Sequence, residues 1–227
     1  MLAGGLGTRI AGLYPDLPKA MVPVGGRPFI DVLLDRLARL GLTDVVLCAG
    51  HKAGLLVDHF QGHDVRVIIE DEPRGTAGAL AFARAQTGHG EETFLALNGD
   101  TFAEFDPEAL LALHRALDAD ATLACYRVEE AAERGGVEAG EDGRLKGFHE
   151  KAKRGSSWVS GGVYALEPRV LDAVPPGRAT SLEVDLFPAL LEEGRTLGAW
   201  RAPGGFWDIG TPAGLREAEA RLKGSVS

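Results

Sequence analysis

The sequence is poor in cysteine, in net positive charge and in long apolar runs. Two cysteines occur among 227 residues, Cys48 and Cys125, each inside an apolar, strand-like run, so we expect buried free thiols rather than a disulfide or a metal site. The net charge of -9 argues against a general binder of nucleic acid or anionic membranes, because both attract basic surfaces. No apolar stretch of about 18 residues and no signal peptide is recognisable, which favours a soluble, cytoplasmic protein.

Two widespread phosphate-binding loops are also missing. A P-loop requires G-x-x-x-x-G-K-[ST], and this string does not occur. The dinucleotide fingerprint G-x-G-x-x-G would begin at Gly5, but Ile10 stands where its third glycine belongs. The next strand-like run ends in AGH at 49–51 and offers no acid for a ribose. A nucleotide site in this chain therefore has to be built differently.

What the sequence does have is a glycine-rich loop near its start, AGGLGTR at 3–9, with Lys19 further on behind Pro18. Glycines let backbone N–H groups approach a polyphosphate closely, and Arg9 and Lys19 would offset its charge. The loop is typical of a nucleotide-binding site, although a glycine-rich turn with no role in binding or catalysis is the simpler alternative. Only three residues, Met1–Ala3, precede the first glycine of the loop, whereas a supporting strand of about five is usual, so we expect an upstream start or an unusually short strand.

The hydrophobic pattern that follows predicts an α/β protein. Helical spacing at 29–40 is followed by a buried strand at 44–50, a short helix at 55–60 and another buried strand at 65–69. A helix at 77–87, a strand at 94–97 and an amphipathic helix at 107–117 continue the alternation. We expect a Rossmann-like, mostly parallel mixed sheet flanked by helices, with ligands at the carboxyl ends of its strands. From Ala121 onward, short β-like pieces separated by glycines indicate a small antiparallel lobe.

Three later positions could carry chemistry. Asp100 follows a strand and a glycine, where a carboxylate can hold a cation beside a phosphate, although aspartate after glycine is also a common turn. Asp208 lies between an aromatic residue and a Gly-Thr-Pro turn that begins the last helix. Thr76, in the segment EDEPRGTAG at 70–78, could simply cap the helix that follows. In the run SLEVDLFPALL at 181–191 the spacing is helical, and Pro188 should bend or break that helix.

Taken together, these motifs resemble the family of sugar-1-phosphate nucleotidylyltransferases. The family signature G-G-x-G-T-R, a spacer and P-K is similar to Gly4–Arg9 with Pro18 and Lys19, and MVPVGGRP at 21–28 looks like the run that follows it. The spacer at 14–18 is most similar to the heptose-1-phosphate guanylyltransferase group. The chain as a whole resembles D-glycero-D-manno-heptose 1-phosphate guanylyltransferase and mannose-1-phosphate guanylyltransferase-like members. Matching motifs recur near residues 75, 100, 150 and 208, so the resemblance covers nearly the whole chain.

The resemblance implies a Mg²⁺-dependent transfer of a nucleotide, with GTP favoured, from its triphosphate to a sugar 1-phosphate. It also implies one nucleotidyltransferase domain over 1–227, with 1–120 binding the nucleotide and 121–227 the sugar phosphate. The catalytic residues would be Arg9, Lys19, Asp100 and Asp208, the two aspartates holding the metal. Nucleotide contacts would come from Ala3, Gly4, Gly5, Gly7, Thr8, Arg9, Gly75, Thr76, Asn98 and Gly99. Sugar-phosphate contacts would come from Gly136, Glu150, Lys151, Gly161 and Gly162.

Some alternatives stay open at this point. The family often has an aromatic residue at Gly135 and an amide at Ser160, so the resemblance does not specify the sugar. Glu150 and Lys151 could also be an exposed charge pair on a strand end. Glucose 1-phosphate, a muramic-type sugar phosphate or phosphocholine with another nucleotide would suit the same chemistry. A catalytically silent regulatory relative is the alternative from another class, and the oligomeric state, a homo-oligomer included, is not specified.

Overall fold

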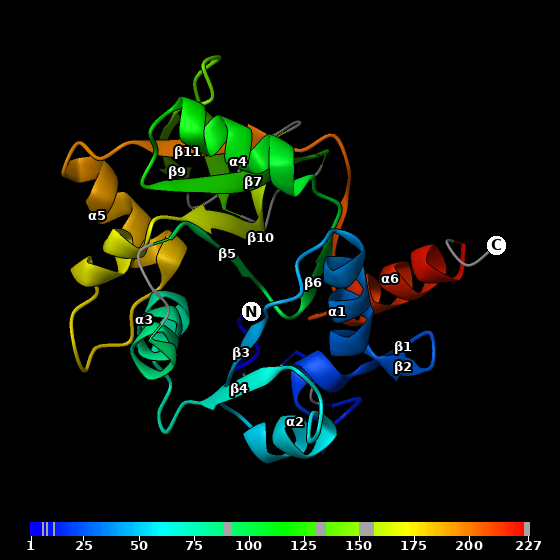
Figure 1. The fold of residues 1–227 in the computed structure, drawn as a ribbon. Helices are drawn as coiled ribbons and strands as arrows, with labels where there is room; N and C mark the ends of the chain where they lie inside the picture. The colour runs from blue at the N-terminus through cyan, green and yellow to red at the C-terminus, as the bar shows by residue number, and fades with distance from the viewer. Residues whose placement is uncertain are drawn as a thin grey trace. The chain divides into compact units, whose positions relative to one another are not determined.

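The structure is a computed structural model that describes residues 1–5, 7, 9–10, 12–88, 92–129, 135–149 and 157–224, without the side chains of 222–224. The chain forms two compact units (Figure 1). The first unit contains Met1–Pro73, Asn98–Phe102 and Trp207–Ser227. The second unit contains Arg74–Leu97 and Ala103–Phe206. Each unit is described by itself.

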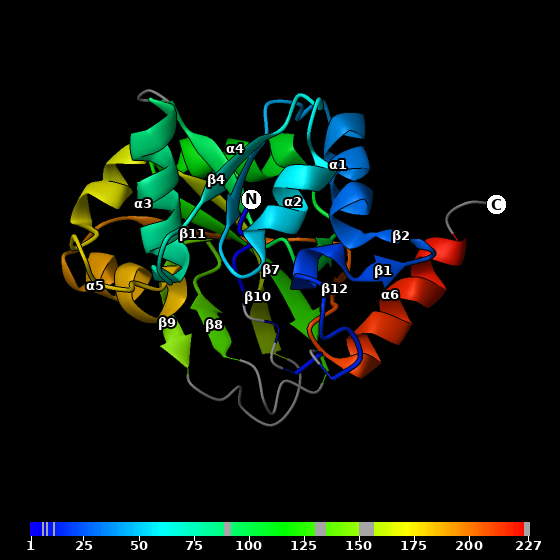
Figure 2. The same cartoon turned by 90° about the horizontal axis from the view of Figure 1, so that it is seen from below.

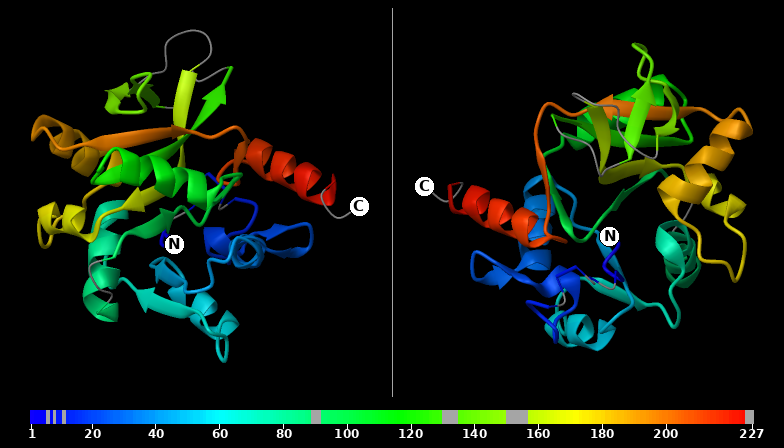
Figure 3. Two further views of the ribbon diagram at one scale, coloured as in Figure 1. Left: turned by 45° about the horizontal axis from the view of Figure 1, so that its top comes forward. Right: turned by 180° about the vertical axis from the view of Figure 1, so that it is seen from behind.

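The first unit combines short helices with two strands that pair in parallel. Along the chain it holds η1 (Lys19–Met21), β1 (Pro23–Val24), β2 (Arg27–Pro28), α1 (Phe29–Arg39), β3 (Val46–Ala49), α2 (Ala53–His59), β4 (Arg66–Ile69) and α6 (Pro212–Gly224). Strand β3 pairs with β4 in parallel, and Leu2 makes parallel bridges to both Cys48 and Asn98. Helix α2 lies beside β4 (Figure 2), and α6 lies beside β1 (Figure 3).

Helix α1 shows how the sequence pattern becomes structure in the first unit. Phe29, Leu33 and Leu37 recur at helical spacing and are buried, as a helix with one apolar face requires. Gly41 has φ +78°, a left-handed conformation that glycine adopts without strain, and Leu42 N–H donates to Leu37 C=O at 2.9 Å. The predicted helix and its glycine stop are therefore confirmed.

The second unit holds a four-stranded sheet with helices around it. Its elements are α3 (Gly75–Thr87), β5 (Phe94–Leu97), α4 (Pro107–Ala116), β7 (Ala121–Val128), β8 (Gly136–Ala139), β9 (Leu145–His149), β10 (Ser157–Leu166), η2 (Pro168–Ala173), η3 (Leu182–Leu186), α5 (Phe187–Glu192) and β11 (Leu197–Arg201). The sheet order is β11-β7-β10-β5, and α4 lies on β7 (Figure 1). The chain crosses between the two units within β6 (Thr101–Ala103) and β12 (Phe206–Asp208), which pair with each other.

Strand directions in this sheet agree with the predicted class. Strand β11 runs parallel to β7, while β10 is antiparallel to both β7 and β5, so β5, β7 and β11 share one direction. Strands β8 and β9 form the separate antiparallel pair that the glycine-rich stretch predicted. An α/β fold with a mostly parallel mixed sheet and flanking helices is thus confirmed. The segment around Pro188 is a π-helix, η3, followed by α5 with the proline in its first turn.

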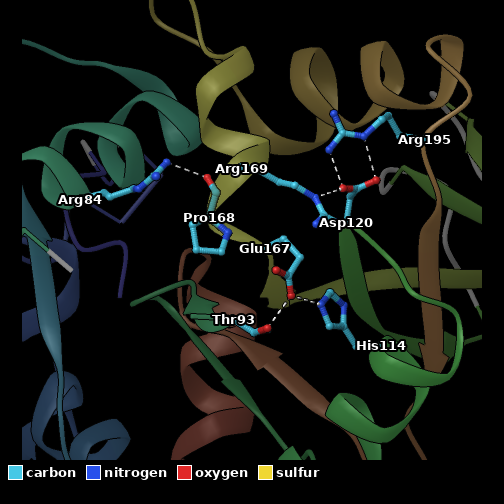
Figure 4. A network of polar contacts seen from close by, with 8 residues as sticks. All are labelled: Arg84, Thr93, His114, Asp120, Glu167, Pro168, Arg169 and Arg195. Atoms are coloured by element: carbon cyan, nitrogen blue, oxygen red, sulfur yellow. Dashed lines mark hydrogen bonds and ion pairs between the residues drawn. The ribbon is translucent and has the colours of Figure 1, made fainter. Parts of the chain in front are cut away.

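The ends of three strands in the second unit are joined through Asp120 (Figure 4). Its carboxylate accepts Arg169 Nε at 2.7 Å and the forked guanidinium of Arg195, from Nε at 2.8 Å and from Nη2 at 2.5 Å. Its backbone N–H donates to Thr196 C=O at 2.8 Å, and its C=O accepts Glu167 N–H at 2.9 Å. Asp120 therefore links the start of β7 to the residue after β10 and the residue before β11.

One expectation about the core is wrong, and two others are confirmed. The strand β4 was expected to be buried, but Arg66 and Ile69 are exposed because β4 has a partner strand on one side, β3. Cys48 and Cys125 are buried free thiols, as expected, and burial raises the pKa of Cys125 to about 12. None of the described helices combines the length and the apolar content that crossing a bilayer would need.

Candidate active site

Three charged side chains from distant parts of the sequence meet in the first unit. Lys19 Nζ donates to Asp100 Oδ2 at 2.5 Å and to Asp208 Oδ1 at 3.4 Å. The Lys19 side chain is 10% exposed, while the two carboxylates keep 33% and 23% of their surface accessible. One ammonium group thus bridges two carboxylates that are open enough to receive a further ligand.

Asp100 is positioned by the chain just beyond β5. Gly99 N–H donates to Leu2 C=O at 2.8 Å, which fixes this segment against the first residues of the chain. A Cβ atom on Gly99 would lie 2.8 Å from Leu2 O and 3.4 Å from Ala3 Cα, so the close approach requires glycine. Thr101 Oγ1 donates to Asp100 Oδ1 at 3.2 Å and leaves Oδ2 directed at Lys19.

Asp208 ends β12 and is held by the turn that follows it. Ile209 N–H donates to Asp100 C=O at 3.0 Å, which ties the two carboxylate-bearing segments together. Gly210 N–H donates to Asp208 Oδ1 at 2.7 Å and orients that carboxylate. A Cβ atom on Gly214 would lie 1.9 Å from Asp208 O, so the first turn of α6 packs directly on this residue.

Lys19 reaches the carboxylates from η1, which follows the glycine-rich loop in the sequence. It is the first residue of η1, and Pro18 before it has an extended conformation with φ -66°. Gly7 has φ +60°, and a Cβ atom there would lie 3.2 Å from Lys19 Cβ. The loop glycine therefore packs on the lysine stem, and the stem spans from the loop to Asp100.

The other described residues of the loop differ in how closely they are packed. Ala3 is buried and donates its N–H to Cys48 C=O at 2.8 Å. A Cβ atom on Gly4 would meet Glu70 Oε1 at 2.9 Å, whereas nothing lies within 4 Å of the corresponding position on Gly5. Arg9 is exposed in the turn after the loop. Thr8 lies outside the described residues.

The charges at this centre favour another cation. Two carboxylates and one ammonium leave one negative charge, and Lys19 already shows that both carboxylates can contact the same cation. The described residues contain no group of three or more His, Cys, Asp and Glu side chains that could hold a metal. A divalent ion here would therefore need further oxygen ligands from water or from a phosphate. Mg²⁺ binds in this way, because it keeps several waters and takes one or two carboxylates plus substrate phosphates.

The residues predicted to contact the base belong to the second unit. Gly75 begins α3 with φ +70°, and a Cβ atom there would lie 2.5 Å from Thr180 O, so the site requires glycine. Thr76 does not cap the helix, since its Oγ1 accepts Leu182 N–H at 2.7 Å. Ala77 N–H also donates to Thr180 C=O, at 2.9 Å. The Gly75–Thr76 pair is thus anchored to the segment 180–182.

The predicted sugar-phosphate residues are only partly described. Gly136 begins β8, opposite His149 of β9. Gly161 and Gly162 lie where the register of β10 shifts against β7, and Gly162 has φ +71°. A Cβ atom on Gly161 would lie 2.1 Å from Tyr126 Cε2, so this glycine makes room for a buried ring. Glu150 and Lys151 lie outside the described residues.

Two residues that the sequence reading did not single out support the centre. Gly210 both orients Asp208 and makes space for Lys19, because a Cβ atom there would lie 2.2 Å from Lys19 Nζ. Thr101 holds the second oxygen of Asp100. The glycine two residues after Asp208 is visible in the sequence and could have indicated the role of Gly210. Nothing in the sequence pattern indicates the role of Thr101.

Comparison with known proteins gives a consistent result along the chain. A family profile described as "Nucleotidyl transferase" matches residues 1–225. The chain is 34% identical over 221 residues to mannose-1-phosphate guanyltransferase of Schizosaccharomyces pombe, across 93% of this chain and 60% of that protein. It is 33% identical over 229 residues to mannose-1-phosphate guanylyltransferase of Mycobacterium tuberculosis, across 98% and 63%. The chain thus spans less than two thirds of the length of these relatives.

Solved structures resemble the chain over nearly its full length. HddC from Yersinia pseudotuberculosis, in a crystal structure complexed with GMP-PN, matches with a TM-score of 0.83, 28% identity and 97% coverage of both chains. A putative glucose-1-phosphate thymidylyltransferase from Bacillus anthracis matches with a TM-score of 0.82 over 98% of this chain and 93% of that one. Because its identity is 22%, this second match speaks for the fold alone.

Proposed function

This chain belongs to the nucleotidyl transferase family, and from that premise we propose that it joins a nucleoside triphosphate to a sugar 1-phosphate. The products are a nucleoside diphosphate sugar and pyrophosphate. GTP is the proposed donor, and a sugar 1-phosphate of the mannose or heptose type is the proposed acceptor. Two relatives named for guanylyl transfer to mannose 1-phosphate and a structural neighbour crystallised with GMP-PN support this choice.

The observation that carries the proposal is the contact of Lys19 with both Asp100 and Asp208. The reaction brings two anions together and releases a third, so it needs positive charge at fixed positions more than it needs a proton acceptor. A phosphate monoester has a second pKa of about 6 and is largely dianionic near neutral pH, so the attacking oxygen needs no general base. A centre that combines cationic side chains with carboxylates able to bind a metal ion supplies the positive charge that this reaction needs.

The bonds exchanged in the proposed reaction are simple to state. An oxygen of the sugar phosphate attacks the α-phosphorus of the triphosphate and forms a new P–O bond. The bond from the α-phosphorus to the bridging oxygen of the β-phosphate breaks, and the pyrophosphate leaves with the electron pair. Asp100 and Asp208 would hold Mg²⁺, which when bound neutralises phosphate charge. Oxygen ligands of this kind are what that ion prefers.

The remaining roles belong to the chain's own groups. Arg9 would bind the leaving pyrophosphate through its forked guanidinium, while Lys19 and Lys151 would act as compact positive charges on the phosphates. The backbone N–H groups at 3–9, with Asn98 and Gly99, would line the nucleotide phosphates. Gly75 and Thr76 would bind the base through their backbone, because the Thr76 hydroxyl already accepts Leu182 N–H. The sugar would be bound by Glu150, Gly136, Gly161 and Gly162. Residues 1–120 would thus bind the nucleotide, and residues 121–227 would bind the sugar phosphate.

A pyrophosphate-release screen tests the proposal directly. The purified chain is incubated with Mg²⁺ and each of four nucleoside triphosphates, crossed with mannose, heptose, glucose and muramic-type 1-phosphates and phosphocholine. We expect the fastest release with GTP and a mannose- or heptose-type phosphate. Faster release with UTP or dTTP and glucose 1-phosphate would correct the substrates. The absence of release with every pair would contradict the enzymatic function and favour a silent regulatory homologue.

A further inference from the structure

We propose that Lys19 occupies the cation position between Asp100 and Asp208 until a divalent metal displaces it, so that metal entry is coupled to release of the ammonium group. This inference rests on the proposed metal role of the two aspartates. It assigns Lys19 two successive partners, first the carboxylates and then the phosphates of the substrates.

The geometry of the contact carries the first step. Lys19 Nζ lies 2.5 Å from Asp100 Oδ2, so the two charged groups are in direct contact. It also contacts Asp208 Oδ1 at 3.4 Å, so one ammonium group reaches both carboxylates. A Mg²⁺ ion bound to carboxylate oxygens at about 2.0–2.1 Å would need the same space. The ammonium and the ion therefore compete for one position.

Charge makes the competition strong. Like charges repel steeply at contact distance when the site is partly shielded from water, and the Lys19 side chain is 10% exposed. A dication that binds both carboxylates would remove the attraction that holds Lys19 and add a repulsion. The flexible lysine stem permits the ammonium to swing away, whereas the carboxylates are fixed by Thr101 and by the Gly210 N–H.

Gly210 provides a second, independent observation for this exchange. A Cβ atom on Gly210 would lie 2.2 Å from Lys19 Nζ and 2.8 Å from Asp208 Oδ1. A residue with a side chain at this position would push the ammonium away from the carboxylates. The absence of a side chain at residue 210 thus keeps the position between the carboxylates available to Lys19.

The exchange has a functional consequence for the order of events. Before the metal binds, the ammonium screens two neighbouring carboxylates from each other, so they need not separate. After the metal binds, the same ammonium is free to contact an incoming phosphate. Productive positive charge on Lys19 therefore becomes available only when the metal is in place.

Direct Mn²⁺ binding to the nucleotide-free protein tests the inference. Mn²⁺ affinity is measured by electron paramagnetic resonance of the free ion for wild type, Lys19→Met and the double variant Lys19→Met/Asp100→Asn. We expect Lys19→Met to bind Mn²⁺ at least about tenfold more tightly than wild type, because the competing charge is gone. The double variant should lose that gain, which would assign the gain to these carboxylates. Equal affinity of wild type and Lys19→Met would overturn the exchange.

A variant that keeps the lysine provides the matched comparison. Gly210→Ala places a methyl carbon 2.2 Å from Lys19 Nζ and 2.8 Å from Asp208 Oδ1, so it crowds the shared position and should weaken Mn²⁺ binding. Gly54→Ala in α2 is the control, because nothing lies within 4 Å of the added carbon, and its Mn²⁺ affinity should equal that of wild type. Circular dichroism spectra check that each variant is folded. Equal Mn²⁺ affinity of Gly210→Ala and Gly54→Ala would contradict a shared position for the ammonium and the ion.

Movement of Lys19 is followed separately by lysine acylation and mass spectrometry. We expect Mg²⁺ to raise the acylation rate of Lys19 several-fold relative to the exposed Lys146, which serves as the internal control. An unchanged ratio would overturn the release of the ammonium. Pyrophosphate release by the same wild-type preparation reports on the proposed function independently. The exchange can therefore fail while the enzymatic function stands, and the two failures are distinguishable.

Discussion

At the level of single side chains, opposite charges hold the centre of the first unit together. The motifs in the sequence predicted Asp100, Asp208 and Lys19 as candidates, but not that the lysine contacts both carboxylates. The contacting residues are 81 and 189 positions apart, so the contact depends on tertiary packing that no local pattern contains. As catalytic residues, all three stay predictions.

We predict that Asp100→Asn removes most of the activity without unfolding the protein. The amide keeps the shape of the side chain but loses the charge that holds Lys19 and would hold the metal. Loss of one contact of this kind typically lowers turnover by about 100-fold or more. The measurement is pyrophosphate release together with the urea midpoint of unfolding. The matched control is Asp35→Asn, an exposed carboxylate of the first unit that pairs with Arg27, and it should retain wild-type turnover. Near-normal turnover in Asp100→Asn would refute the role.

At the level of elements, local pattern was a good guide to helices and a poorer guide to strand partners. The apolar spacing of α1 was predicted from the sequence. The cap of α4, where Asp106 accepts Glu108 N–H at 2.9 Å, was not predicted and comes from the structure. The parallel pairing of β7 with β11 joins residues 76 positions apart and could not be read locally. Exposure of β4 also depended on the number of its partners rather than on its own apolar residues.

Gly161 is expected to matter for packing as well as for any sugar contact. We predict that Gly161→Ala lowers the free energy of unfolding by about 1–3 kcal/mol, because the added carbon overlaps the ring of Tyr126. Gly147→Ala in β9 is the control, since nothing lies within 4 Å of its added carbon, and its effect should stay within about 0.5 kcal/mol. Urea unfolding measures both. Equal midpoints for the two variants would show that the strand accommodates the methyl group.

The Asp120 cluster predicts a pH-dependent contribution to stability. Hydrogen bonds from Arg195 lower the pKa of Asp120 below its ordinary value of 3.8; burial opposes this shift, and Arg169 adds to it. A carboxyl group whose pKa is lower in the folded state than in the unfolded state stabilises the fold. This stabilisation is complete above the unfolded-state pKa and is lost as the pH falls through the folded-state pKa. Asp120→Asn should therefore cost about 1–3 kcal/mol at pH 7, because two guanidinium groups lose their charged acceptor.

Unfolding midpoints in urea between pH 7 and pH 2.5 test this expectation. The difference between wild type and Asp120→Asn should be complete at pH 7 and shrink below pH 3.8. Asp172→Asn removes an exposed carboxylate that pairs with Arg84 and should change stability little at any pH. A pH-independent difference for Asp120→Asn would mean that shape rather than charge makes residue 120 important.

At the level of the whole molecule, the family predicted from the motifs is confirmed by the profile that matches residues 1–225. That prediction depended on the resemblance of Gly4–Arg9, Pro18 and Lys19, and of the motifs near residues 75, 100, 150 and 208, to the family's signature. The sugar could not be predicted, since the residues assigned to it are partly glycines, whose role is to leave space.

Nucleotide binding should stabilise the folded chain in proportion to affinity. We predict that GTP with Mg²⁺ raises the melting temperature more than ATP, CTP or UTP, because a ligand present at about 100 times its Kd adds about 2.7 kcal/mol to the free energy of unfolding. Differential scanning fluorimetry with matched nucleotide concentrations measures the shifts. GTP without Mg²⁺ is the control for the metal. Equal shifts for all four nucleotides would contradict guanine preference.

The chain enters the first unit for only five residues, Asn98–Phe102, between two long stretches of the second unit. Asp100 lies within these five residues, whereas Lys19 comes from the beginning of the sequence and Asp208 from near its end. Neither unit can consequently be excised as one continuous piece of polypeptide. A chimera that exchanges the whole second unit with that of a relative must carry four junctions to keep the carboxylate of residue 100 with its partners.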